Sequence, residues 1–239
     1  MSETQTARCA LPLLQPAQAQ KHVTVNEALI RLDAAVNLVL QSRMVAQPPA
    51  SAPEGQCWAV PVGASGGWAG HAGEIAVAAG NGWIFVPARA GMRAFVRDEG
   101  VQATHDGGDW LAGALTLGSN GSGLLAGMAE ARVAVTPGVV VETTALIPHA
   151  ALVIGATARV IEPLTGTLES WSLGSEGAAD RFGSGMGKAA GSWARGMLSQ
   201  PTVYWDGGAL RLTAVGGEFA GGVVEVAVHW LELQVPRMG

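Results

Sequence analysis

Residues that could perform catalysis are spread thinly along this sequence. The five histidines include no pair at i, i+2 or i, i+4, a spacing by which one strand or helix could present two metal ligands. Serines in the glycine-rich stretches 118–123 and 183–185 do not form a G-x-S-x-G nucleophile elbow. The sequence therefore predicts no catalytic residue, no metal site, no cofactor and no enzyme.

Two weaker chemical signals lead to the same expectation. Residues 183–188 read GSGMGK, which lacks the G-x-x-x-x-G-K-[ST] spacing of a phosphate-binding loop. A glycosidase needs two carboxyl groups on either side of the scissile bond, but nothing singles out a pair among the acidic residues of the C-terminal part. These residues are Glu162, Glu169, Glu176, Asp180, Asp206 and Glu218.

Aromatic residues near glycine-rich turns give the most specific binding signal. Sugars bind by stacking on aromatic rings while nearby polar side chains contact their hydroxyl groups. The alternative is that the tryptophans pack in the core, where tryptophan is common. The predicted glycan-binding residues are Trp171, Arg181, Trp193, Tyr204, Trp205 and Asp206.

Composition excludes several other classes of function. The chain has 239 residues, a formal net charge of −5 and no basic run, so binding to nucleic acid or to an anionic membrane is not expected. The N-terminus lacks a signal-peptide pattern, and the apolar stretches are strand-sized, so no membrane insertion is expected. Cys9 and Cys57 are expected to be reduced thiols in a protein made in the cytoplasm.

The first 44 residues are predicted to serve attachment or oligomerisation. Residues 1–22 are expected to form an extended arm, because Pro12 and Pro16 prevent a long helix. Residues 24–42 are expected to form a helix that begins with a capping box of Thr24 and Glu27. The apolar residues assigned to attachment or oligomerisation are Leu11, Leu13, Leu14, Leu29, Leu32 and Val36.

The rest of the chain is expected to be mainly β. Residues 45–117 read as a small β-hairpin domain with a turn at Asn81-Gly82, and residues 118–137 as a linker. Residues 138–239 alternate apolar and polar side chains, as in Val224–Trp230, which predicts an antiparallel, jelly-roll-like β-sandwich. This domain is expected to bind the receptor.

Three segments resemble a known group of proteins. They are QAQKHVTVNEAL (18–29) with Leu32-Asp33, then PEG (53–55), GGWAGH (66–71) and NGW (81–83), and finally IPH (147–149), Gly174, RFG (181–183) and LRLTA (210–214). Together they are similar to uncharacterised proteins encoded in alphaproteobacterial prophages and gene transfer agents. The resemblance implies a tail fibre or head spike of a phage-like particle and supplies no catalytic residue.

These observations predict a virion component that mediates host adhesion by carbohydrate binding. The expected partners are other capsid or tail proteins, a cell-surface polysaccharide and further copies of the chain, with a trimer favoured as the homo-oligomer. The protein would be made in the cytoplasm and released on the particle. The alternatives are a polysaccharide-degrading enzyme of such a particle and a purely structural connector.

Overall fold

The computed structural model describes residues 4–14 and 21–237. The chain divides into two compact units, residues 1–117 and 118–239, each with its own core. Both units are mainly β, as the sequence predicts, with one α-helix among the described residues. No helix in these ranges is long and apolar enough to cross a membrane.

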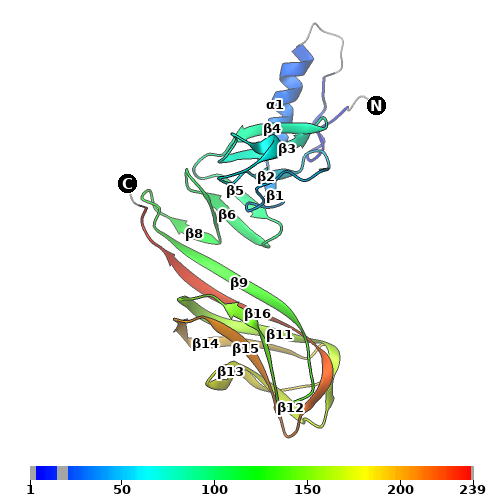
Figure 1. Cartoon of the computed structure of the whole chain (residues 1–239), viewed down its shortest axis with the longest axis vertical. Helices are drawn as coiled ribbons and strands as arrows, with labels where there is room; N and C mark the ends of the chain where they lie inside the picture. The colour runs from blue at the N-terminus through cyan, green and yellow to red at the C-terminus, as the bar shows by residue number, and fades with distance from the viewer. Residues whose placement is uncertain (1–3, 15–20, 238–239) are drawn as a thin grey trace. The chain divides into compact units, whose positions relative to one another are not determined.

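The first unit is built on a seven-stranded sheet in the order β4-β3-β2-β1-β5-β6-β7, packed with helix α1 (Figure 1). The short strand β1 lies between β2 and β5 and pairs with both in parallel. The remaining pairs are antiparallel. Its elements are α1 (Lys21–Ala35), β1 (Val39–Leu40), β2 (Cys57–Ala59), the 3-10 turn η1 (Gly66–Trp68), β3 (Glu74–Ala79), β4 (Gly82–Pro87), β5 (Arg93–Val96), β6 (Val101–His105), β7 (Trp110–Ala112) and β8 (Ala114–Leu117).

The predicted helix over residues 24–42 is wrong at both ends. Helix α1 already begins at Lys21, so Thr24 lies within it and Glu27 forms an ion pair with Arg31 (2.8 Å) rather than a capping box. The helix ends at Ala35, and Asn37 then takes a positive φ of 46°. Asparagine tolerates this left-handed conformation, which turns the chain into β1.

Both faces of this sheet are covered by apolar side chains. One face packs Leu40, Ile75 and Val77 beneath α1. The other carries a cluster of Trp58, Trp68 and Trp83, with ring centroids 5.1–6.1 Å apart. The predicted hairpin between β3 and β4 exists, but its turn residues are Gly80 (φ 57°) and Asn81 (φ 63°), one position earlier than expected.

The second unit is a jelly roll of two packed antiparallel sheets (Figure 1). One sheet has the order β10-β15-β12-β13, and the strands of this unit in the other sheet have the order β14-β11-β16-β9. Counted from β9, the eight strands β9–β16 have the interleaved order 1-8-3-6 and 2-7-4-5, which confirms the predicted sandwich. The strands are β9 (Gly123–Ala134), β10 (Val140–Ile147), β11 (Ala151–Gly166), β12 (Ser170–Ser175), β13 (Ala178–Met186), β14 (Trp193–Tyr204), β15 (Gly208–Val215) and β16 (Phe219–Gln234).

The predicted linker at residues 118–137 is wrong, because most of it is strand β9. Twelve residues of β9 pair with β16, from Val223 opposite Ala134 to Gln234 opposite Gly123. One glycine of β9 is required by its neighbour, because a Cβ atom on Gly127 would lie 2.3 Å from the indole ring of Trp230. A small residue that resembles a linker residue in the sequence therefore makes room here for a large buried side chain.

The N-terminal arm is held against the C-terminal end of α1 as far as it is described. The carboxylate of Asp33 is buried and accepts hydrogen bonds from Thr6 Oγ1 (2.8 Å) and from the backbone amides of Arg8 (3.0 Å) and Cys9 (2.6 Å). Arg8 in turn donates to the carbonyl oxygens of Asp33 and Ala34 at the end of the helix. The run Gln15–Gln20 of the predicted arm lies outside the described residues.

Candidate functional site

The structure does not gather the predicted glycan-binding residues into one platform. Trp171 on β12 has no exposed surface, and its Nε1 donates to the carbonyl of Gly187 at 3.0 Å. Its ring belongs to the core between the two sheets. The assignment of Trp171 to a glycan site is therefore wrong, and the alternative of a core tryptophan holds at this position.

A second group of these residues lies at one end of strands β13 and β14. Tyr204 is half-buried, shares a hydrogen bond between its hydroxyl and Ser175 Oγ (2.9 Å), and has the Arg181 guanidinium 5.9 Å from its ring centroid. Trp205 and Asp206 follow at an exposed turn, where 69% of Trp205 is accessible. Trp205 is free to contact a ligand, whereas Tyr204 is already engaged within the unit.

Trp193 lies at the opposite end of β14. It pairs with Arg159 of β11, whereas Tyr204 pairs with Ala151 of the same strand. Eight positions at about 3.3 Å each separate the two aromatic residues by roughly 26 Å. A single sugar ring cannot contact both.

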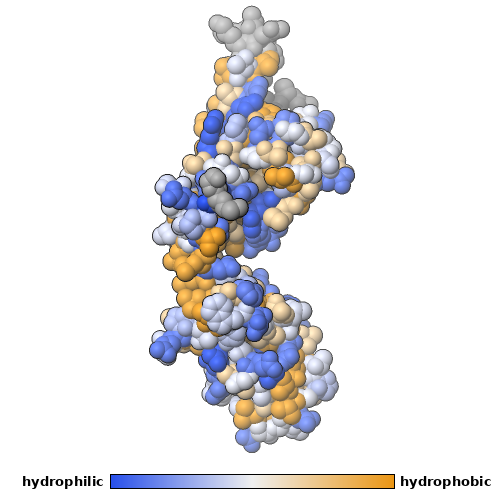
Figure 2. Space-filling model, turned by 60° about the vertical axis from the view of Figure 1, so that its left-hand side comes forward, coloured by the Kyte–Doolittle hydropathy of each residue, from blue (hydrophilic) through white to orange (hydrophobic). Residues whose placement is uncertain are grey.

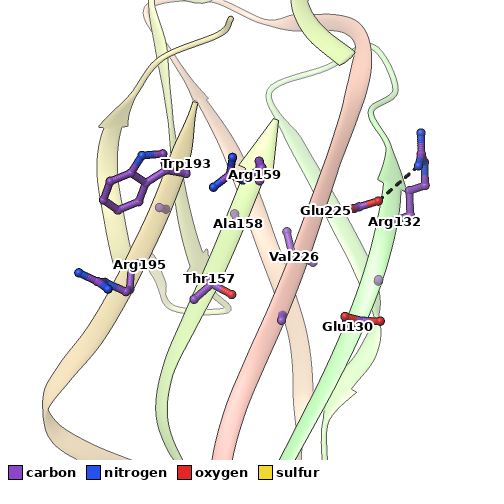
Figure 3. Close-up of a pocket in the computed structure, with 12 residues that line it drawn as sticks. Glu130, Arg132, Thr157, Ala158, Arg159, Trp193, Arg195, Glu225 and Val226 are labelled. Atoms are coloured by element: carbon purple, nitrogen blue, oxygen red, sulfur yellow. Dashed lines mark hydrogen bonds and ion pairs between the residues drawn. The ribbon is translucent and has the colours of Figure 1, made fainter. Parts of the chain in front are cut away.

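An open groove of about 820 Å³ lies on the outer face of the sheet at Trp193 (Figure 3). Side chains alternate across the sheet, so Ala158, Ala194 and Val226 point into the core while their neighbours point into the groove. The strand registers place the outward residues in two rows. The first row is Trp193, Arg159, Glu225 and Arg132, and the second is Arg195, Thr157, Ala227 and Glu130.

The groove differs in charge between its two ends. Over β14 and β11, Trp193 is 59% exposed and lies beside Arg159 and Arg195 (Figure 3). The guanidinium groups of Arg159 and Arg195 make no hydrogen bond or ion pair with any residue that the structure describes. The other end carries Glu130 and Glu225, so one half of the groove is aromatic and cationic and the other is acidic.

The third arginine of the groove, Arg132, forms ion pairs with acidic side chains. Arg132 forms ion pairs with Glu225 (3.3 Å) and Glu162 (3.6 Å), and the first of these is drawn in Figure 3. Its charge is therefore compensated within the protein. The guanidinium groups of Arg159 and Arg195 remain available to a ligand.

The sequence indicates Trp193 but not the rest of this groove. Its lining residues come from four strands that are far apart in the chain, and only the order β14-β11-β16-β9 brings them side by side. One signal is visible in the sequence: residues alternate between the two faces of a strand, so Trp193 and Arg195 lie on the same face, with Ala194 on the other.

The residues predicted to mediate attachment are only partly exposed. Leu14, Leu32 and Val36 are 49%, 52% and 40% exposed, whereas Leu11, Leu13 and Leu29 are half-buried. Val23 and Val25, which the prediction did not include, are 58% and 40% exposed. Figure 2 shows apolar atoms near the top of the view, below the grey atoms, in the region of the helix.

Metal binding and thiol chemistry have little support among residues 4–14 and 21–237. These ranges contain no group of three histidine, cysteine or acidic residues that could hold a metal ion. Cys57 is buried, and burial raises the pKa of its thiol to about 11, so the reactive thiolate is a minor form at neutral pH. Neither observation identifies a catalytic centre.

Comparisons with known proteins give a family for part of the chain. Residues 25–111 match the model of a family described as a protein of unknown function, DUF2793, which covers less than half of the sequence. No curated protein matches the chain. Among solved structures, the cyanophage Pam1 capsid asymmetric unit is similar at 25% identity, over 46% of this chain and 85% of that chain, with a TM-score of 0.33. A TM-score this low does not establish a shared fold. The family to which part of this chain is similar is DUF2793, through residues 25–111.

Proposed function

We propose that this protein is a structural component of a phage-like particle and that its C-terminal jelly roll binds a polysaccharide on the recipient cell. The groove at Trp193 carries the proposal, because it presents an exposed indole ring beside two arginines without partners among the described residues. A largely exposed tryptophan contributes little to the core and is well placed to stack on a sugar ring.

The particle part of the proposal is supported by the sequence. The segments that resemble prophage and gene-transfer-agent proteins include residues 66–71 and 81–83, which lie within the range 25–111 matched by the family model. The jelly roll is also an architecture that viral capsid and lectin domains use, although a fold alone does not fix a function. Attachment would use the first unit, and binding to the cell would use the second.

Multiple copies would make weak contacts effective. An open groove with one exposed aromatic ring buries little of a ligand, so we expect weak binding by a single copy. Several copies on one particle raise the effective concentration at a surface that repeats the same sugar. Two exposed apolar side chains, Leu32 on α1 and Val36 directly after it, are the residues that we propose for contact between copies or with the particle.

Binding of the fluorescently labelled full chain to recipient cells tests this function. Cells would be compared before and after their surface polysaccharide is removed, and the medium would be analysed for released oligosaccharides. Loss of binding on stripped cells, without released fragments, supports adhesion. Equal binding to both cell preparations contradicts it, and released fragments would instead support a polysaccharide-degrading enzyme.

The variant Trp193→Ala links that result to the groove. Because Trp193 is 59% exposed, the variant should remain folded and bind cells poorly. Trp205→Ala is the matched control, since Trp205 is 69% exposed but follows the other end of β14. Undiminished binding by Trp193→Ala would place the contact elsewhere.

A further inference from the structure

We infer that the groove selects an acidic polysaccharide, one whose sugar rings carry carboxylate groups. This inference rests on the proposed function and specifies its ligand. The observation that supports this inference is the arrangement of Trp193, Arg159 and Arg195 at one end of the groove (Figure 3). It combines a stacking surface with two guanidinium groups that form no ion pair with a described residue.

The backbone fixes the spacing of these three side chains. Arg159 is directly opposite Trp193 on the neighbouring strand, a position at which Cβ atoms are about 5 Å apart. Arg195 follows Trp193 by two positions on the same face of β14, at about 7 Å. A sugar ring stacked on the indole would therefore have a guanidinium group within reach on two sides.

Carboxylate is the group that best fits this environment. A guanidinium group donates two parallel hydrogen bonds to a carboxylate, and such charge-assisted pairs are stronger than hydrogen bonds between neutral groups. A neutral sugar would use the indole ring but leave both positive charges uncompensated. A sugar with a carboxylate uses both features of this end of the groove.

The acidic end of the groove argues against a nucleic acid as the ligand. The carboxylate of Glu130 makes no hydrogen bond or ion pair with any residue that the structure describes, and that of Glu225 forms an ion pair with Arg132. Carboxylates accept hydrogen bonds from sugar hydroxyl groups, but they repel a polymer that carries a negative charge on every unit, as a nucleic acid does. A polysaccharide in which only some of the sugars carry a carboxylate can place neutral sugars at this end of the groove.

The experiment is an array of bacterial polysaccharides that contain uronic acids, each printed beside its carboxyl-reduced, neutral form. The full chain should bind acidic forms and bind their reduced forms at least about tenfold more weakly. The strongest binder would then be titrated in solution with the variants Arg159→Gln and Arg195→Gln. Each should lose affinity for the acidic form by about tenfold and lose little affinity for the reduced form.

The control variant is Arg93→Gln, because Arg93 is an exposed arginine on β5 that does not line the groove. Its affinity should equal that of the unmodified chain. Melting temperatures of all three variants should be unchanged, since every substituted side chain is exposed. A loss of affinity in Arg93→Gln equal to that in the groove variants would indicate a general effect of charge and contradict the assignment of the site.

The remaining outcomes separate this inference from the proposed function. Equal binding of acidic and reduced forms, lost in Trp193→Ala, would retain glycan binding and overturn the selection for acid. No binding to any polysaccharide would contradict both. Binding of a single-stranded oligonucleotide as tight as that of the acidic polysaccharide would show an unselective anion site and overturn the inference.

Discussion

At the scale of single residues, tryptophans of the same unit have opposite environments. Trp171 is completely buried between the sheets and its indole N–H has a backbone partner, whereas Trp193 is 59% exposed above a groove. Burial of the first stabilises the fold, and exposure of the second leaves its ring available to a ligand. The two side chains should therefore respond differently to the same substitution.

We predict that Trp171→Ala lowers the free energy of unfolding by about 3–5 kcal/mol, because a large cavity would remain in the core. Trp193→Ala should change it by well under 1 kcal/mol, as is usual for surface positions. Urea denaturation of both variants and of the unmodified chain measures the difference. Equal destabilisation by the two substitutions would contradict the assigned environments.

Asp33 gives the N-terminal arm a dependence on pH. Burial by itself would raise the pKa of this carboxyl group, but hydrogen bonds from the Cys9 and Arg8 amides and from the Thr6 hydroxyl outweigh burial and leave the pKa lowered. A carboxyl group with a lowered pKa stabilises the folded state fully above its ordinary pKa, near 3.8. That contribution is lost as pH falls through the lower pKa of the folded state.

We therefore predict that protection of the Arg8 and Cys9 amides from hydrogen exchange decreases in acid, below the ordinary pKa of aspartate. In Asp33→Asn, protection should already be reduced at neutral pH and should lack the acid-dependent step. Amide exchange followed by NMR across this pH range measures both chains. An unmodified chain whose two amides stay equally protected throughout would show that Asp33 does not hold the arm.

At the scale of elements, the long pairing of β9 with β16 depends on a small residue. Gly127 faces the ring of Trp230 across the two strands, and no side chain fits there. We predict that Gly127→Ala destabilises the second unit by about 1–3 kcal/mol through overpacking. Gly118→Ala is the control, since its added Cβ would come no closer than 3.5 Å to any other atom. Thermal unfolding compares them, and equal melting temperatures would argue against the strand pairing described.

Strand β1 joins two parts of the first sheet. It lies between β2 and β5, and its Leu40 is completely buried. Deletion of residues 1–44 removes this strand together with α1, so we predict that residues 45–117 then lose their tertiary packing while residues 118–239 stay folded. Limited proteolysis of the shortened chain tests this prediction, because cleavage should concentrate within residues 45–117. A first unit that resists cleavage would mean that the sheet does not need β1.

The sequence predicts the elements whose pattern is local, and fails where tertiary contacts decide. Alternation at Val224–Trp230 identifies β16 because one face of that strand is buried. Val39 and Leu40 continue the helical spacing of α1, so the sequence could not show that Asn37 ends the helix and that β1 follows. Gly127 resembles a linker residue until Trp230 is placed opposite it.

The same reasoning explains the partial prediction of the site. Trp193 was identified by its type, but burial of Trp171 depends on packing between sheets that no local pattern reveals. Arg159 and Trp193 are 34 positions apart in the sequence and adjacent only through the pairing of β11 with β14. A site made from side chains of four strands requires the strand order before its members can be named.

At the scale of the whole molecule, we propose a division of labour between its two units. The first would provide attachment through the arm, α1 and their exposed apolar residues, and the second would provide recognition through the groove. Each unit has its own core, so recognition should not require the first unit to be bound to a particle. The central claim is that the surface around Trp193 contacts the glycan.

The most direct test is NMR of the indole N–H groups in the full chain, titrated with a polysaccharide that binds it. Signals would be assigned with Trp→Phe variants at positions 171, 193 and 205. The account predicts that the Trp193 signal shifts with saturation, while the signals of buried Trp171 and of distant Trp205 stay in place. A titration in which Trp205 shifts and Trp193 does not would contradict the account.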